Sequence, residues 1–136
     1  MDHLIIIIDE HPAPADMAGY GLLTEHGLCI YFEKDGKKWM IDTGASDRFA
    51  ENATRLGVDI AAVDHLIISH NHYDHTGGLE VFLKYNSRAR IHLSEWIKDS
   101  RCLSVRNGKS VDIGLDRTLL EDYRERIRWH PSVNMR

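Results

Sequence analysis

The segment HLIISHNHYDHTGG, residues 65–78, constrains this chain more than any other. A short apolar run is followed by three histidines and an aspartate within six positions. His70 and His72 are two residues apart, so in an extended segment both imidazoles point to the same side and can bind one metal ion. Asp74 and His75 come from the turn that follows, and they can reach a second ion or complete the first. A lone histidine on a strand is usually a core or surface residue, but four metal-competent residues so close together seldom are.

Zinc suits this set of ligands because it readily takes imidazole nitrogen and carboxylate oxygen, although manganese or iron would also fit. Two zinc ions would lower the pKa of a shared water and stabilise charge that develops on a substrate oxygen. Asp74 could then hold or accept the proton of that water, which makes it the candidate catalytic residue. Gly77 and Gly78 are expected to let the backbone turn tightly and to leave room beside the metal.

Hydrophobic patterning predicts alternating strands and helices around this motif. The Asp35-Gly36 pair marks a tight hairpin turn, and Gly57 marks a helix end. Residues 95–114 read as polar and irregular, with a turn at Asn107-Gly108. The expected strands are 4–8, 27–33, 37–44, 65–69 and 88–94, and the expected helices are 46–57, 78–86 and a last one from Arg117 to about Trp129, capped by Asp116.

This order predicts an α/β (α+β) fold, a mixed sheet with helices on one face. Residues 4–8 and 66–68 are apolar continuously rather than alternately, so both faces of the sheet are expected to be covered. The chain is expected to lack the residues needed to cover the second face. We therefore expect half of a sandwich, which needs a partner chain or a further C-terminal portion.

Composition excludes several classes of function. With 136 residues and a mass of 15.6 kDa, the chain fits one domain over residues 1–136. The net charge is −4 and the 17 Lys and Arg are dispersed, so we expect no nucleic-acid partner. The longest aliphatic run is too short to span a membrane and is not a signal peptide, so we expect a cytoplasmic protein without a membrane partner. Cys29 reads as a core residue and Cys102 as incidental.

The HNHYDH segment has the HxHxDH pattern of the metallo-β-lactamase superfamily, and DTG at residues 42–44 resembles its second signature. The stretches EHGLCIYFE, KWMIDTG, ENATRLGVDI and VDHLIISHNHYDHTGGL are most similar to the branch of 7,8-dihydropterin-6-methyl-4-(β-D-ribofuranosyl)-aminobenzene-5′-phosphate synthases and related metallohydrolases. The resemblance covers about residues 4–94 well and continues more loosely through residues 111–127.

The resemblance implies an αββα sandwich, of which this chain would be the N-terminal half. It implies that His70 and His72 bind the first metal and that Asp74 and His75 bind the second. Asp42 resembles the buried aspartate that braces the metal loops, although a simple turn residue is an equal alternative. It further implies hydrolysis of an anionic or phosphorylated small molecule, which could be pterin-related.

The second half of the sandwich should bring further ligands, and no matching segment follows the motif here. His130 is a weak candidate for one of them, and a solvated residue after a helix is the better interpretation. We therefore expect a homodimer or a missing C-terminal half. Zinc hydrolysis is favoured over diiron redox chemistry, because the redox branch carries a carboxylate at the position of His72. The alternative is a catalytically incomplete fragment or metal-binding association module, and a third reading makes the histidines incidental.

Overall fold

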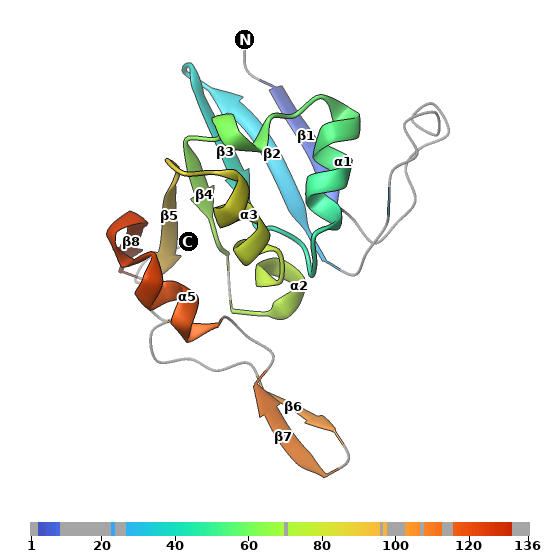
Figure 1. The fold of residues 1–136 in the computed structure, drawn as a ribbon, viewed down its shortest axis with the longest axis vertical. Coiled ribbons are helices and arrows are strands. Elements are labelled where there is room, and N and C mark those ends of the chain that lie inside the picture. The colour runs from blue at the N-terminus through green and yellow to red at the C-terminus, as the bar shows by residue number, and fades with distance from the viewer. Residues whose placement is uncertain are drawn as a thin grey trace.

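A computed structural model describes residues 3–8, 23, 27–69, 71–95, 97, 103–106, 108–112 and 116–131. Its main element is a six-stranded sheet in the order β1-β2-β3-β4-β5-β8 (Figure 1). Strands β1 to β3 are antiparallel neighbours, whereas β3, β4, β5 and β8 run parallel. The strands of the sheet are β1 His3–Ile8, β2 Cys29–Lys34, β3 Lys37–Ile41, β4 His65–Ile67, β5 Arg90–Ser94 and β8 Ile127–His130.

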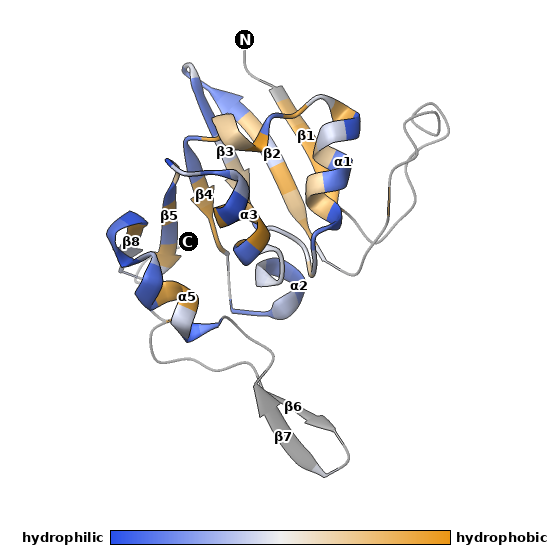
Figure 2. Ribbon diagram, in the orientation of Figure 1, coloured by the Kyte–Doolittle hydropathy of each residue, from blue (hydrophilic) through white to orange (hydrophobic). Residues whose placement is uncertain are grey.

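Helices α1 (Arg48–Leu56) and α3 (Leu79–Tyr85) lie over one face of this sheet (Figure 1). Figure 2 shows that β1 and much of β2 and β4, the strands beneath them, are hydrophobic. The core forms between these two layers, and its fully buried large side chains include Phe49, Met40, Leu66, Phe82 and Ile91. The predicted mixed sheet with helices on one face is therefore confirmed.

The first three strands form as their sequence predicts. Asp35 and Gly36 have φ values of 52° and 77°, the two positive angles of the tightest hairpin turn. The turn sets Lys34 opposite Lys37 and Phe32 opposite Trp39. Cys29 is fully buried, as expected, whereas Cys102 lies outside the described residues. Burial raises the pKa of the Cys29 thiol, so this cysteine is an unreactive core residue.

Helix α1 buries Phe49 and Ala53 against the sheet and ends at Gly57, whose left-handed φ of 76° lets its N–H reach two carbonyls of the last turn. The predicted end of this helix is thus confirmed. The helix also buries Asn52, which the sequence did not single out. Its side-chain amide donates to the carbonyls of Ile7 and Leu23 at 2.9 and 2.8 Å, so it fastens the helix to the end of β1.

The opposite face of the sheet is uncovered by the described residues. In β1, Ile7 is buried towards the helices, but Leu4 and Ile6 are 63% and 50% exposed on the other side. The second apolar face predicted for residues 4–8 is present, and no described residue covers it, which agrees with the expected half of a sandwich. The strand is apolar on both faces, yet only one of them has a packing partner, and Leu4 and Ile6 form an exposed apolar area.

The last predicted helix, from Arg117 to about Trp129, is wrong beyond its first turns. Helix α5 covers only Arg117–Asp122, with the predicted cap, because the Asp116 carboxylate accepts from the N–H of Thr118 at 2.9 Å. A 3₁₀ turn, η3 (Arg124–Arg126), follows and leads into β8. Ile127 and Trp129 face the core while Arg128 and His130 alternate with them. Burial that alternates with a period of two is typical of a strand. A strand also pairs with the backbone N–H and C=O groups at the open edge of β5, which a helix could not do.

Two smaller elements complete the described fold. Strands β6 (Leu103–Arg106) and β7 (Lys109–Asp112) pair as an antiparallel hairpin in the stretch that we expected to be irregular. The turn signal there was right, since Gly108 has a φ of 75° between the two strands. The other element is the 3₁₀ turn η2 (Ile60–Ala62), capped by the Asp59 carboxylate. Among the described residues, no helix has the length and apolar character needed to cross a membrane.

Three histidines form a row across the uncovered face. The Nδ1 atom of His65 lies 2.9 Å from Nε2 of His92, and Nδ1 of His92 lies 2.8 Å from Nε2 of His130. Trp39 stacks on the His65 ring with 4.1 Å between ring centroids. Desolvation, followed by the charges of His65 and His130, lowers the pKa of His92 to about 4. Arg128 and Arg90 act in the same direction, so the neutral form of His92 is favoured.

The histidine row predicts that acid destabilises the fold. An unfolded histidine takes up a proton near pH 6.5, whereas folded His92 resists protonation down to about pH 4. The unfolded state therefore binds more protons in this window, and stability that is complete above about pH 6.5 falls as the pH drops towards 4. In a chelator-containing buffer, the melting temperature should be several degrees lower at pH 5 than at pH 7.5. His92→Gln should reduce this difference, and an unchanged difference would contradict the assignment.

Candidate metal centre

The histidine-rich motif lies at the carboxyl end of β4, where the chain leaves the sheet. His72 caps the short helix α2 (Tyr73–Thr76) in an extended conformation, and Asp74 and His75 lie within that helix. Gly77 and Gly78 then lead into α3. His70 lies outside the described residues. Three of the four predicted metal ligands can therefore be placed.

Asp42 is the buried centre of this region. It follows β3 with a φ of 61°, a left-handed conformation that aspartate tolerates better than most side chains. Its Oδ1 accepts the N–H of Ser69 at 2.7 Å, and its Oδ2 accepts the hydroxyl of Ser69 at 2.6 Å. The same Oδ2 lies 2.7 Å from Nδ1 of His75. The carboxylate thus joins the end of β3 to both sides of the motif, as expected for a residue that braces the metal loop.

The contact with Asp42 determines which nitrogen His75 can offer to a metal. In the neutral ring, a hydrogen on Nδ1 donates to the Asp42 carboxylate, and the lone pair of Nε2 is then the one that can bind a metal. Nε2 lies 3.3 Å from Oδ2 of Asp74. Two ligands at about 2.1 Å from a tetrahedral zinc are roughly 3.4 Å apart, so the pair has the spacing of two ligands of one ion. The donor set of Asp74 and His75 therefore fits zinc.

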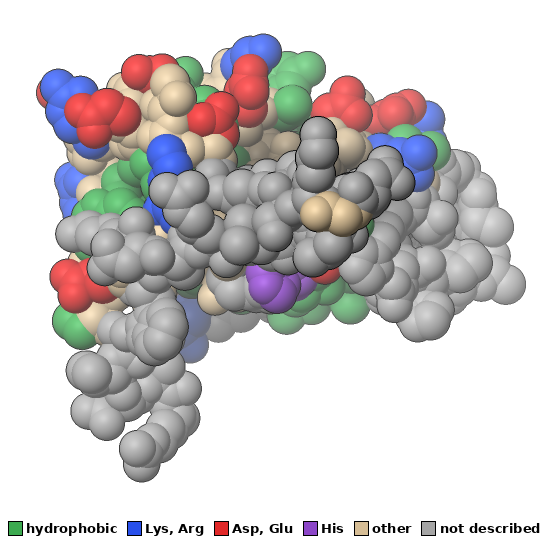
Figure 3. Space-filling model, turned by 90° about the horizontal axis from the view of Figure 1, so that it is seen from below, with side chains coloured by type: hydrophobic (Ala, Val, Ile, Leu, Met, Phe, Trp, Pro, Cys, Tyr) green, Lys and Arg blue, Asp and Glu red, His purple; other side chains and the backbone are tan. Residues whose placement is uncertain are grey.

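His72 is held through its backbone. Its carbonyl accepts the N–H groups of His75 and Thr76 at 2.9 and 3.0 Å and the Thr76 hydroxyl at 3.0 Å. The ring of His72 is exposed. Figure 3 views the molecule from the end where α2 lies and shows histidine at the surface in the middle of that face. The motif is therefore at the surface of the described chain, with its backbone fixed and this ring accessible.

Neighbouring backbone segments hold α2 from behind. The N–H of Thr43 donates to the carbonyl of His75 at 2.9 Å, and the N–H of Leu28 donates to the carbonyl of Asp74 at 3.2 Å. The N–H of Gly44 in turn donates to the Leu28 carbonyl at 2.9 Å. Both residues of the Asp74-His75 pair are thus fastened to segments more than 30 positions earlier in the sequence.

The glycines of the motif serve close packing rather than unusual backbone angles. A Cβ on Gly77 would lie 2.0 Å from the carbonyl oxygen of Ala45, and one on Gly78 would lie 2.6 Å from the carbonyl oxygen of Thr43. Gly77 has an ordinary helical φ of −62°. Gly27 is under the same constraint, because its Cβ would lie 2.3 Å from the carbonyl oxygen of Asp74. The sequence interpretation named the first two glycines but not this reason for them.

Among the described residues, to which His70 does not belong, no group of three His, Cys, Asp or Glu side chains converges as a metal site. The ligand roles of His70, His72, Asp74 and His75 and the catalytic role of Asp74 therefore stay predictions. His130, a weak ligand candidate, instead lies in the histidine row on the sheet. Sequence reasoning missed Ser69, Thr43 and Leu28, although the position of Ser69 directly before the motif is a usable signal.

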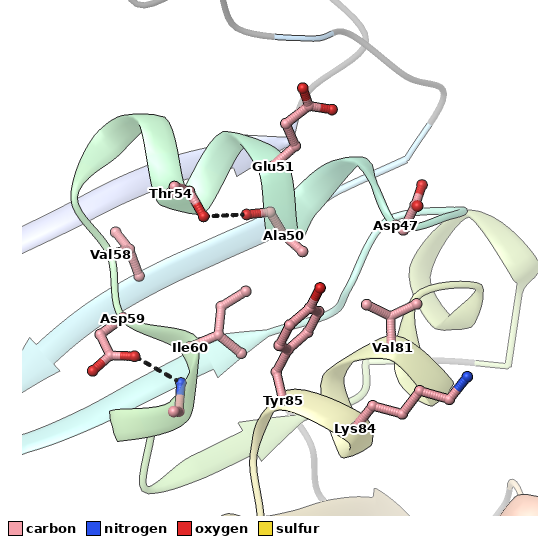
Figure 4. Close-up of a pocket in the computed structure, with 11 residues that line it drawn as sticks. Asp47, Ala50, Glu51, Thr54, Val58, Asp59, Ile60, Val81, Lys84 and Tyr85 are labelled. Atoms are coloured by element: carbon pink, nitrogen blue, oxygen red, sulfur yellow. Dashed lines mark hydrogen bonds between the residues drawn. The ribbon is translucent and has the colours of Figure 1, made fainter.

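A hollow of about 630 Å³ lies elsewhere, between α1, η2 and α3 (Figure 4). Asp47, Glu51, Asp59, Lys84 and Tyr85 surround it, and none of the described residues of the motif lines it. Glu51 is already paired with Arg55 at 2.5 Å, and Asp59 caps the N–H of Ala61. This hollow is on the helical side of the molecule, away from the candidate metal ligands, so it does not define their substrate site.

Comparison with known proteins gives a family for this geometry. The metallo-beta-lactamase superfamily matches residues 23–101. The 7,8-dihydropterin-6-methyl-4-(beta-D-ribofuranosyl)-aminobenzene-5′-phosphate synthase of Methanocaldococcus jannaschii is 34% identical over 76 residues, 51% of this chain and 26% of that protein. The anaerobic nitric oxide reductase flavorubredoxin of Enterobacter sp. (strain 638) is 28% identical over 116 residues, 76% of this chain and 24% of that protein.

A solved structure extends the likeness to the fold. The crystal structure of Tm1679, a metal-dependent hydrolase of the beta-lactamase superfamily, matches with a TM-score of 0.65 and 26% identity. The match covers 96% of this chain but 42% of that one. The chain therefore spans less than half the length of each of these three relatives.

Replacing Gly77 tests the close packing behind α2. Gly77→Ala should lower the free energy of unfolding by about 3 kcal/mol, because its Cβ collides with backbone. Gly57→Ala is the matched control, since a Cβ there meets no atom within 4 Å and only the left-handed φ costs about 1 kcal/mol. Urea denaturation measures both. Equal losses would show that residues 45 and 77 are not in such close contact.

Proposed function

Because this chain belongs to the metallo-β-lactamase superfamily, we propose that it is a metal-dependent hydrolase whose metal ligands are His70, His72, Asp74 and His75. Membership and the likeness to Tm1679 support a metal-dependent hydrolase fold. The ligand assignment is supported above all by one observation. The buried carboxylate of Asp42 holds Nδ1 of His75 at 2.7 Å and leaves Nε2 beside Asp74.

The residues divide the chemistry between them. Bound zinc would supply a water of lowered pKa and would polarise a substrate oxygen. Asp42 orients His75 and fixes its tautomer, which raises the basicity of the nitrogen offered to the metal. The Asp74 carboxylate lies in the same turn, where it can accept the proton of the attacking water on one of its oxygens. The exposed His72 ring lies at the side from which a substrate can approach.

The substrate that we propose is an anionic, phosphorylated small molecule. The relative from M. jannaschii is named for a 5′-phosphate product, and its 34% identity over 76 residues supports a phosphorylated, pterin-related compound. We propose zinc as the metal, with manganese or iron as alternatives. The imidazole of His72 favours hydrolysis, whereas a relative with redox activity, the flavorubredoxin, favours the alternative of iron.

Metal loading and turnover test this function together. Protein purified without chelator should carry zinc in native mass spectrometry, and it should hydrolyse bis(4-nitrophenyl) phosphate. Asp74→Ala and His72→Ala should each lower kcat/KM by roughly a hundredfold or more, since loss of a ligand disables the activated water. Lys84→Ala, a 68% exposed side chain on the helical side, is the control and should retain activity. Zinc binding without turnover would support the alternative of an incomplete enzyme or association module, and an iron-dependent visible spectrum would reverse the choice of metal.

The same proposal includes a partner for the uncovered face of the sheet. A binuclear centre takes more ligands than the four of the motif. In addition, Leu4 and Ile6 are exposed, whereas a second layer packed on this face would bury them. We propose a homodimer, because two-fold pairing is the commonest way for identical chains to cover such a surface. A single domain over residues 1–136 and a cytoplasmic location belong to this proposal. A layer supplied by a further C-terminal portion is the alternative.

Sedimentation velocity tests the pairing. The unaltered chain should sediment as a dimer and Ile6→Lys as a monomer, because the charge would be buried in the interface. Tyr85→Lys is the matched control: this side chain is 61% exposed but lies on the helical side, so the dimer should persist. A monomeric unaltered chain would reject the homodimer. A dimer that survives Ile6→Lys would place the interface elsewhere.

A further inference from the structure

Thr43 is a fully buried residue that no metal-ligand motif assigns, and it contacts α2 at two points. Its hydroxyl donates to the carbonyl of His75 at 3.0 Å and accepts the N–H of Gly78 at 3.0 Å. Its own N–H donates to the same His75 carbonyl at 2.9 Å. One side chain therefore spans α2 from its third residue to the start of the next helix.

Residues 42 and 43 hold His75 at both ends. Asp42 binds the ring through Nδ1, and Thr43 binds the backbone carbonyl through two donors. A ring that is hydrogen-bonded at one nitrogen can still pivot about that bond. Because the carbonyl is fixed as well, the direction of Nε2 towards Asp74 is determined.

Helix α2 cannot provide this rigidity by itself. It has four residues, about one turn, and an isolated turn of helix is unstable because nucleation fixes several dihedral angles for few hydrogen bonds. The geometry of any ligand carried on such a turn must come from outside it. The contacts of Thr43 supply this support, with that of Leu28 at the Asp74 carbonyl.

We propose that Thr43 is a positioning residue for the Asp74-His75 ligand pair, acting through its hydroxyl on the His75 carbonyl and the Gly78 amide. The proposal rests on the metal-binding function proposed above. The competing explanation is a purely structural role, in which the hydroxyl merely satisfies a buried N–H. The two explanations differ in whether metal affinity changes more than stability alone requires.

Zinc affinity, measured by competition with a chromophoric chelator, separates them. Thr43→Val keeps the shape of the side chain but lacks the hydroxyl, and it should weaken zinc binding roughly 10- to 100-fold, the usual effect of removing a group that orients a ligand. Thr43→Ser keeps the hydroxyl and should bind zinc as the unaltered chain does. If Thr43→Val does not fold, Thr43→Ala compared with Thr43→Ser isolates the same hydroxyl.

Asn86→Ala controls for lost stability. The Asn86 amide donates to the carbonyls of Ile60 and Val63, both at 2.9 Å, so its removal destabilises the core away from the motif. It should lower the melting temperature and leave zinc affinity unchanged. If zinc affinity follows the melting temperature equally in Asn86→Ala and Thr43→Val, Thr43 is only structural and the proposal is overturned.

A metal-free measurement distinguishes this proposal from the function on which it rests. Long-range ¹⁵N–¹H NMR correlations of the His75 ring should show hydrogen on Nδ1 in the unaltered chain and in Thr43→Ser, and a mixture of tautomers in Thr43→Val. An unaltered chain that binds no zinc rejects the proposed function, whatever Thr43 does. An unchanged tautomer and unchanged zinc affinity in Thr43→Val reject the role of Thr43 alone.

Discussion

The hydrogen bonds of the Asp42 carboxylate are the constraint on which the region around the motif depends. This fully buried carboxylate contacts Ser69 and His75, and the backbone N–H of Asp42 donates to the Ile67 carbonyl at 2.8 Å. A buried carboxylate is stable only when its partners are in place, so the ends of β3 and β4 and the turn of α2 form as one unit. The left-handed backbone of Asp42 is the strained conformation that this unit has to maintain.

Much of the fold could be predicted from sequence because its signals are local. The Asp35-Gly36 turn, the Gly57 helix end and the Asp116 cap each follow from residue types that act within a few positions. Strand β8 could not, since its conformation depends on pairing with β5, more than 30 residues earlier. The helix predicted from Arg117 to about Trp129 follows local signals, and pairing with the edge of a distant strand overrides them.

The candidate site shows the same division. The motif identifies its metal-competent side chains by spacing alone, and the DTG signature points to Asp42 as their brace. The supporting contacts of Thr43 and Leu28 are backbone geometry between segments far apart in sequence, which no local pattern encodes. The need for Gly77 arises likewise from the approach of Ala45, not from its own dihedral angles. Spacing thus names the candidate side chains, and the fold shows which contacts hold the described ones.

The histidine row has a further property that follows from its connectivity. His92 uses Nε2 towards His65 and Nδ1 towards His130, so its one ring hydrogen belongs to one contact or to the other. If it lies on Nε2, His92 donates to His65 and accepts from His130; if it lies on Nδ1, both directions reverse. The three rings are therefore not independent bases but a single chain with two opposite polarities. A dipole brought near either end would select one polarity and transmit that choice across the width of three strands.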